Sequence, residues 1–213
     1  MKLWYLAFLL LWSHPLLLFA QSDWELRKDK NGIKVYTKDA ENSDFRAYRG
    51  VTTLETSLSS IVAAIRDISS YPEWMPNASS TRALEEKGDT SIIYYLSTDA
   101  PWPAKDRDGI YEVVFRAEGN RSLRIKLEDR PEYLPRKEDY VRIPETDGFW
   151  LLTNLPDQEV KVTYQISVDP GGSIPAWLAN PMSVSQPYKT LRALEKRVQM
   201  DKYKGKQYSF LPQ

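Results

Sequence analysis

The 213-residue sequence contains no cysteine, and its single histidine, His14, lies within the first twenty residues. The rest of the chain therefore lacks Ser-His and Cys-His nucleophile pairs, histidine general bases, and zinc sites built on His or Cys. Without disulfides, stability depends on the core alone, which suits a bacterial periplasm better than a small extracellular module. We expect no catalytic residues, no metal and no cofactor.

The chain also lacks an excess of charge and any internal division. Lys and Arg together number 29, Asp and Glu together number 29, and the formal net charge is zero. This neutrality argues against a nucleic-acid partner. No Gly/Ser linker, charge block or internal repeat separates segments of the remaining chain, so we expect one monomeric domain over residues 21–213.

Residues 1–20, MKLWYLAFLLLWSHPLLLFA, have the pattern of a secretory signal peptide. An early lysine precedes a leucine-rich run that is interrupted between Ser13 and Pro15, and a small residue, Ala20, ends the run. Cleavage near Ala20 and Gln21 would export the protein, in our interpretation to the periplasm. The alternative is a retained membrane anchor, for which this apolar run is short.

Much of the chain alternates apolar and polar side chains. The alternation is clear in residues 108–118, 121–129 and 159–169, and shorter strands are expected at 33–38 and 45–53. Strands with one apolar and one polar face form an antiparallel sheet that is solvated on the outside. We therefore predict a sheet with one dry face.

Two segments have helical spacing instead. The first begins at Leu58 and is expected to stop at Pro72, and the second covers residues 173–200, where Pro181 and Pro187 should kink or interrupt the helix. The predicted order is two strands, a helix, many strands and a long helix. This order indicates an α+β fold in which a long helix covers the dry face of a curved antiparallel sheet and encloses a space there.

Three stretches carry a resemblance to a known family: YPEWMPN at 71–77, PWPAKDRDGIYEV at 101–113 and VDPGGSIPAWLAN at 168–180. Together and in this order they resemble the StAR-related lipid transfer (START) family, over about residues 24–202. The resemblance implies a helix-grip fold, in which a curved sheet wraps around a long C-terminal helix and leaves an internal hydrophobic tunnel for one lipid or sterol. It also implies binding or transfer of that ligand without catalysis.

One departure from the family bears on the ligand. The cholesterol-binding branch has a charged pair in its tunnel, and the corresponding positions here are Tyr94 and Val113. A tunnel without that pair is more uniformly apolar and keeps a phenol as its polar group. The departure favours a ligand other than a sterol.

Strand parity and loop composition supply candidate ligand contacts. Three tyrosines have inward parity: Tyr94, Tyr111 and Tyr164. Each is either a core residue with a local hydrogen-bond partner or a contact to a ligand headgroup. Trp74 and Met75 lie between two prolines in a loop, and they are either core residues or part of an adaptable tunnel mouth.

Arg107 shares the inward parity of Tyr111, and Asp106 and Asp108 flank it in the sequence. We favour a structural salt bridge at the start of the strand over a headgroup contact, because a buried arginine is usually paired. Trp102 lies between two prolines and is interpreted as part of a rigid turn rather than as a ligand contact.

The junction before the last helix has the composition of a hinge. Gly171 and Gly172 leave the backbone angle φ unrestricted, whereas Pro175 fixes the first turn of the helix that follows. The helical face beyond this junction comprises Trp177, Leu178 and Met182. We expect this face to close the tunnel when it is loaded and to meet a membrane surface when displaced. A plain strand-to-helix turn remains the alternative.

Three functional hypotheses remain. The first is an exported, non-catalytic carrier of one lipid or other amphiphile, with transient membrane contact. The second is an enzyme like the polyketide cyclases and aromatases of the same superfamily, which without histidine would need Arg107 or a tyrosine as an acid, aided by Asp or Glu. The third is an interaction module with a filled interior. A void-free core favours this module, and a continuous tunnel of several hundred Å³ favours the carrier.

Overall fold

The computed structural model describes residues 23–39 and 44–212. The predicted signal peptide, residues 1–20, lies outside the described residues and stays a prediction. Within the described part of the chain, no helix is both long enough and apolar enough to cross a membrane.

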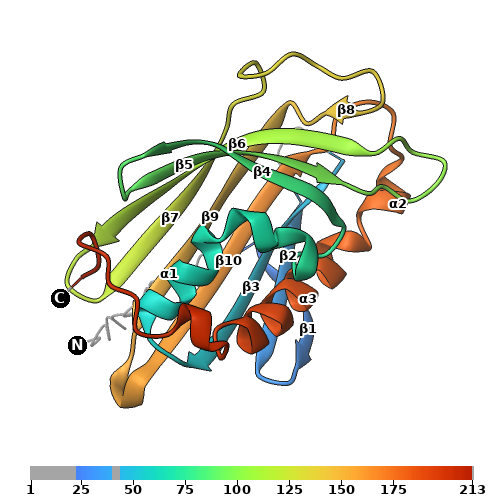
Figure 1. Cartoon of the computed structure of the whole chain (residues 1–213). Coiled ribbons are helices and arrows are strands. Elements are labelled where there is room, and N and C mark those ends of the chain that lie inside the picture. The colour runs from blue at the N-terminus through green and yellow to red at the C-terminus, as the bar shows by residue number, and fades with distance from the viewer. Residues whose placement is uncertain (1–22, 40–43, 213) are drawn as a thin grey trace, which may run out of the picture.

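One large sheet forms the body of the molecule (Figure 1). Its strands are β1 (Glu25–Lys30), β2 (Ile33–Asp39), β3 (Arg46–Glu55), β4 (Ala78–Lys87), β5 (Ser91–Thr98), β6 (Arg107–Glu118), β7 (Ser122–Asp129), β8 (Val141–Arg142), β9 (Glu145–Asn154) and β10 (Glu159–Asp169). Their order is β1-β2-β3-β10-β9-β7-β6-β5-β4, with antiparallel neighbours, and β8 adds a short parallel pairing to β6.

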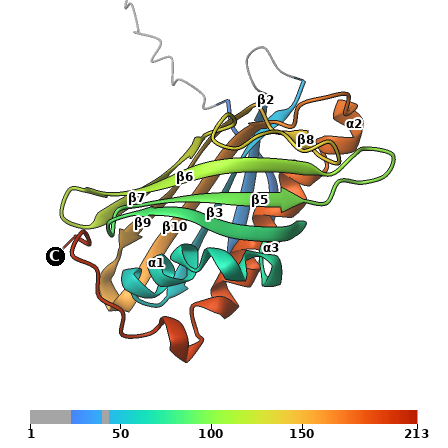
Figure 2. The ribbon, with the colours of Figure 1, turned by 45° about the horizontal axis from the view of Figure 1, so that its top comes forward.

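The helices lie on the concave side of this sheet (Figures 1 and 2). They are α1 (Leu58–Arg66), the 3₁₀ helix η1 (Ile68–Glu73), α2 (Ala176–Ala179), α3 (Met182–Arg197) and the 3₁₀ helix η3 (Asp201–Tyr203), and a further 3₁₀ turn, η2 (Pro156–Gln158), joins β9 to β10. A curved antiparallel sheet wrapped around a C-terminal helix is the predicted α+β helix-grip fold, which is confirmed.

The alternating pattern of the sequence decides which side chains meet the helices. In β10, Val160 and Val162 are buried, whereas Lys161 between them is exposed. Neighbouring strands bring residues of the same parity opposite one another, as Tyr164 lies opposite Gly50 on one side and Trp150 on the other. The inner faces of the strands therefore form one continuous core with α1 and α3.

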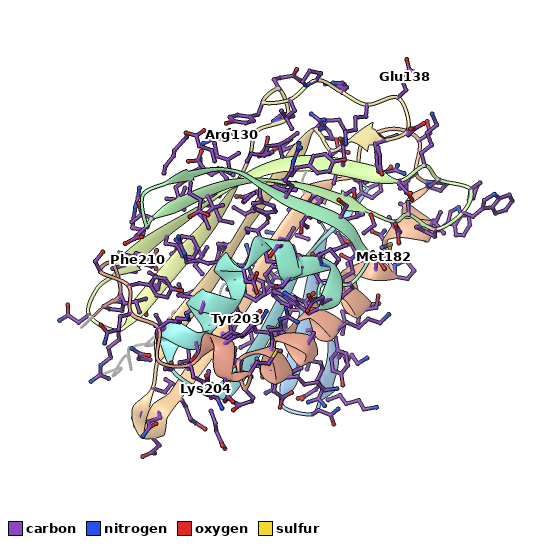
Figure 3. All side chains as sticks on the ribbon, viewed as in Figure 1. Arg130, Glu138, Met182, Tyr203, Lys204 and Phe210 are labelled. Atoms are coloured by element: carbon purple, nitrogen blue, oxygen red, sulfur yellow. The ribbon has the colours of Figure 1, made fainter. Side chains whose placement is uncertain are left out.

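The outer face of β5 and β6 departs from the predicted solvated exterior. Ile93, Tyr95 and Ile110 point outward, yet they are buried in a small second apolar cluster. Leu134 packs against this cluster from the loop between β7 and β8. Figure 3 shows that loop, with Arg130 and Glu138 labelled, above the sheet. The prediction is wrong here because the loop excludes water from this part of the sheet.

The first helix ends earlier than predicted. The Ser57 hydroxyl caps its start by accepting a hydrogen bond from the Ser60 N–H (3.1 Å), and Asp67 ends it by donating its N–H to the Ala63 carbonyl. Pro72 lies in the following 3₁₀ helix, η1, rather than at the end of α1.

The two prolines of the C-terminal segment behave differently. Pro181 precedes α3 and separates it from α2, as predicted, whereas Pro187 lies inside α3 and the helix continues past it. Pro187 packs over Gly50 of β3, where an added Cβ would lie 3.3 Å from the Pro187 Cβ and 2.7 Å from Leu191 Cδ1. Glycine at position 50 therefore lets α3 approach the sheet closely.

Candidate functional site

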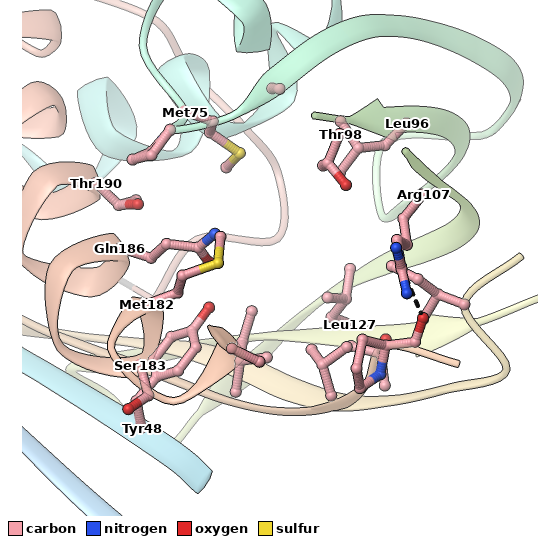
Figure 4. Close-up of a pocket in the computed structure, with 18 of the residues that line it drawn as sticks. Tyr48, Met75, Leu96, Thr98, Arg107, Leu127, Met182, Ser183, Gln186 and Thr190 are labelled. Atoms are coloured by element: carbon pink, nitrogen blue, oxygen red, sulfur yellow. Dashed lines mark hydrogen bonds between the residues drawn. The ribbon is translucent and has the colours of Figure 1, made fainter. Parts of the chain in front are cut away.

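A cavity of about 240 Å³ lies between the concave face of the sheet and the α2–α3 segment (Figure 4). Its wall draws on β3, β5, β6, β7, β9 and β10, on the segment around Met75, and on the first half of α3. Of the predicted site residues, the following line it: Met75, Tyr94, Arg107, Tyr111, Val113, Tyr164 and Met182. The structure therefore brings these predicted residues together from five separate segments of the sequence.

Aromatic rings form much of the inner wall. Tyr94 packs edge-to-face on Tyr71 and tilted against Tyr111, with ring centroids 5.6 Å apart in both pairs. Trp150 stacks on Tyr164 with centroids 4.0 Å apart. These contacts hold the rings in place, so the wall is preformed and largely apolar.

The phenols of the wall are neutral hydrogen-bonding groups. Burial raises the pKa of Tyr94 and of Tyr164 well above the ordinary tyrosine value. It also raises the pKa of Tyr48 to about 12, although a hydrogen bond with Tyr164 works against this shift. Among the described residues, no group hydrogen-bonds the Tyr94 hydroxyl, whereas Tyr71 donates its hydroxyl to the Ile65 carbonyl at 2.6 Å. The Tyr94 hydroxyl therefore has hydrogen-bonding capacity to spare.

Arg107 is the buried cation of the cavity, with 5% of its surface exposed. Its Nε donates to the Pro170 carbonyl (3.2 Å), its Nη2 to the Gly171 carbonyl (3.0 Å), and its Nη1 to the Lys105 carbonyl. Within the described residues, no carboxylate lies at ion-pair distance from the guanidinium. The side chain is thus held by backbone dipoles alone.

The predicted salt bridge between Arg107 and a flanking aspartate is wrong. Asp108 points to the opposite face of β6, because neighbouring strand residues alternate, and it pairs there with Arg142 at 2.8 and 3.0 Å. Asp106 accepts a hydrogen bond from the Ala100 N–H at 2.9 Å instead. Arg142 also binds the Leu134 carbonyl (3.1 Å), so it anchors the loop on the outer face.

Three predicted site residues lie outside the cavity wall. Trp74 is buried in the core, edge-to-face with Tyr71 at 5.6 Å. Trp177 is 75% exposed, and neither it nor Leu178 lines the cavity. The expected single helical face that closes the tunnel is wrong. The helix is interrupted between α2 and α3, so Trp177 and Met182 lie on different helices.

The predicted hinge glycines adopt a defined turn. Gly171 and Gly172 have φ of 65° and 63°, a left-handed conformation that favours glycine. The Gly171 N–H donates to Asp169 Oδ1 at 2.8 Å, and a Cβ on Gly171 would lie 3.0 Å from Pro144 Cδ. The conformation therefore requires glycine. Movement at this turn on ligand binding stays a prediction.

Sequence reasoning missed two polar residues of the cavity wall on α3, Gln186 and Thr190. They follow the predicted Met182 on successive turns of that helix, and Figure 4 shows all three together. Their i, i+4 spacing was a readable signal, because residues so spaced share a helix face. Trp150 was also missed, because apolar residues run together in its strand and blur the alternation.

No group of three or more His, Cys, Asp or Glu side chains in the described ranges is arranged to hold a metal ion. The only carboxylate among the described residues that line the cavity is Asp99, which is exposed. The wall therefore offers aromatic rings, aliphatic groups, hydroxyls, the amides of Asn180 and Gln186, and the guanidinium groups of Arg46 and Arg107.

Comparison with known proteins identifies the family. A profile of the family described as polyketide cyclase / dehydrase and lipid transport matches residues 54–195. The crystal structure of a STAR-related lipid transfer protein from Xanthomonas axonopodis superposes with a TM-score of 0.78 at 39% sequence identity, over 84% of this chain and 99% of that one. The chain belongs to the START family.

Other relatives agree with this assignment. An uncharacterized protein of Pseudomonas aeruginosa is 34% identical over 172 residues, which are 81% of this chain and 85% of that protein. The bovine phosphatidylcholine transfer protein is 24% identical over 163 residues, 74% of this chain and 75% of that protein. Human STARD10 shares the START fold, with a TM-score of 0.69 at 21% identity over 84% of this chain and 74% of that one.

Proposed function

We propose that this START protein binds one lipid or similar amphiphile in its cavity and carries it through an aqueous compartment without altering it. The observation that carries the proposal is the cavity of about 240 Å³, whose wall is aromatic and aliphatic with few polar groups. Burial of an acyl chain in such a wall stabilises the complex by roughly 0.8 kcal/mol for each CH₂ group. Shape and the few polar groups would then set specificity.

A phospholipid is the first candidate for the ligand. The bovine relative is a phosphatidylcholine transfer protein, and the ring faces of Tyr94, Tyr111 and Trp150 can attract a quaternary ammonium group such as choline. A sterol is disfavoured, because Tyr94 and Val113 lie in the wall where the cholesterol-binding branch has a charged pair.

We place this activity outside the cytoplasm, on the pattern of residues 1–20, and at a membrane surface. Trp102 is 90% exposed in the loop between β5 and β6, and Trp177 is 75% exposed on α2. Pro101, next to Trp102, and Ala179, next but one to Trp177, both line the cavity. The two exposed indoles therefore flank its mouth, and indole rings favour the interface between lipid and water.

The cavity supports a carrier better than a cyclase. An enzyme without histidine would need a tyrosine or Arg107 as an acid, and burial raises the pKa of Tyr94 and Tyr111, which makes both weaker acids. A carboxylate to assist them is absent from the deep part of the described wall. The cavity also argues against a ligand-free module with a filled core.

Native mass spectrometry of the protein purified from its own host, followed by lipid extraction, tests this proposal. We expect one amphiphile per chain, released with an unaltered mass. The carrier proposal is wrong if no lipid is recovered and if fluorescent fatty acids, phospholipids and sterols all fail to bind. Recovery of a cyclised product from an added linear polyketide would favour the enzyme.

A further inference from the structure

Arg107 combines three properties that a structural arginine rarely shows together. It is buried, it lines the cavity, and among the described residues its guanidinium has no carboxylate partner. Figure 4 shows the side chain at the cavity, bonded to a backbone carbonyl. Backbone carbonyls occupy three of its five N–H donors, so two donors remain for another acceptor.

The charge balance of the wall is positive. Arg107 and Arg46 line the cavity, against one carboxylate, Asp99. Arg46 lies at the rim and already pairs with Asp39 at 3.0 Å, and Asp106 is engaged with the Ala100 N–H. Among the described residues, Arg107 is therefore the cation of the wall that has no ion-pair partner, and a ligand can supply one. Burying such a charge without a counter-ion is unfavourable.

A second polar side chain projects from the strand position beside Arg107. Thr98 of β5 is directly opposite Arg107 in the pairing with β6, so both side chains project from the same face of the sheet. Thr98 lines the cavity, and within the described residues its hydroxyl has no hydrogen-bond partner. The pair offers a hydroxyl donor beside a forked cation, a combination suited to an oxyanion.

We infer that Arg107, with Thr98, binds the anionic group of the carried amphiphile, a phosphate or a carboxylate. This inference rests on the proposed carrier function and adds the chemical class of the headgroup. Two free N–H groups of one guanidinium can engage two oxygens of such a group. An amphiphile with a neutral headgroup leaves the guanidinium desolvated and unneutralised, so it binds more weakly.

The test compares amphiphiles that differ only in headgroup charge. One pair is a fatty acid and the fatty alcohol of the same chain, and the other is a lysophosphatidic acid and the matching monoacylglycerol. We expect the full-length protein to bind the anionic member of each pair about tenfold or more tightly, the range of a charge-assisted hydrogen bond. In Arg107→Gln the anionic and the neutral member of each pair should bind with nearly equal affinity. Thr98→Val should reduce the preference for the anionic member only in part.

Affinity ratios are taken within each variant, because Arg107 also holds three backbone carbonyls and its loss will lower stability. Arg107→Lys keeps a positive charge and should keep part of the preference. Arg116→Gln removes an exposed charge of the same strand, outside the cavity wall, and should leave the preference unchanged. Equal wild-type affinities for acid and alcohol, or an unchanged preference in Arg107→Gln, would overturn the inference. Failure of every amphiphile to bind would instead overturn the carrier proposal.

Inorganic phosphate alone separates a lipid headgroup from a free anion. At millimolar concentration it should leave the thermal unfolding midpoint unchanged, because most of the binding free energy comes from the acyl chain. A phosphate-dependent rise that Arg107→Gln abolishes would make this a free-anion site and would overturn the assignment to a headgroup.

Discussion

Gly109 decides where the ring of Tyr111 lies in the cavity wall. The two residues share the inner face of β6, and a Cβ on Gly109 would lie 2.3 Å from the Tyr111 hydroxyl oxygen and 2.6 Å from Cε2. The ring therefore lies back over the glycine, along the strand. Glycine at this position keeps the space in front of the ring open.

Gly109→Ala should push the Tyr111 ring into the cavity and weaken ligand binding about tenfold, an effect of the size expected for overpacking. The measurement is titration with a fluorescent fatty acid, with circular dichroism to verify folding. The double variant Gly109→Ala, Tyr111→Ala removes the displaced ring and should recover binding. If it does not, the ring is not what the added methyl group displaces.

At the scale of elements, Asp67 ties the C-terminal end of the chain to the junction between α1 and η1. Its Oδ2 accepts hydrogen bonds from the Tyr203 hydroxyl (2.7 Å) and from Lys202 Nζ (2.9 Å), and its Oδ1 accepts one from Ser69 Oγ (2.9 Å). Figure 3 shows Tyr203 beside these helices. Burial alone would raise the pKa of Asp67, but these hydrogen bonds outweigh it and lower the pKa to about 2.

Asp67→Asn should therefore lower the free energy of unfolding by about 1–2 kcal/mol at pH 7. The folded-state pKa lies below the unfolded value of about 3.9, so the contribution is complete above about pH 4 and is lost as the pH falls toward 2. Urea unfolding at pH 7, 4 and 2.5 measures this change. The difference in unfolding free energy between wild type and Asp67→Asn should shrink as the pH falls toward 2.

Asp201→Asn is the matched control for this experiment. Asp201 is an exposed carboxylate whose ion pair, with Lys204, is also exposed, so its loss should leave the unfolding free energy nearly unchanged. If the difference in unfolding free energy between wild type and Asp67→Asn does not change with pH, the stabilisation does not depend on the charge of the Asp67 carboxylate.

At the scale of the whole molecule, the exposed indoles and the cavity mouth lie at the same end. Figures 1 and 2 both show the loop between β5 and β6 close to α2, and these two segments carry Trp102 and Trp177. A bilayer surface is the proposed partner of this end, because a carrier must take up and release its ligand there.

Trp102→Ala combined with Trp177→Ala should slow lipid transfer between vesicles about tenfold or more, because each buried aromatic side chain contributes roughly 1.5–3 kcal/mol to contact with the bilayer. Affinity for a short-chain, water-soluble lipid should stay at the wild-type value, since neither indole lines the cavity. Leu26→Ala, an exposed apolar residue on the edge strand β1, should leave transfer unchanged. An unchanged transfer rate in the double variant would contradict docking through this end.

The inward side chains of β5, β6 and β10 could be predicted from local patterns. The alternation in residues 159–169 placed Tyr164 inside, and the same parity placed Tyr94 and Val113 there. Trp150 escaped prediction because its strand carries Phe149 and Leu151 on the outer face, where the guanidinium of Arg124 covers the Phe149 ring at 4.3 Å. An apolar residue covered in this way looks like an inward one in the sequence.

The sequence by itself determined on which side of the sheet each strand residue lies, because side-chain direction alternates with a period of two along any strand. Only the tertiary structure decided what each side chain meets there. The predicted salt bridge of Arg107 with a flanking aspartate is wrong, because Asp108 lies on the opposite face of β6 and its partner is Arg142, 34 residues further along the chain. Such partners depend on the register and curvature of the sheet, which are set by long-range contacts. The unpaired state of Arg107 follows from those contacts as well.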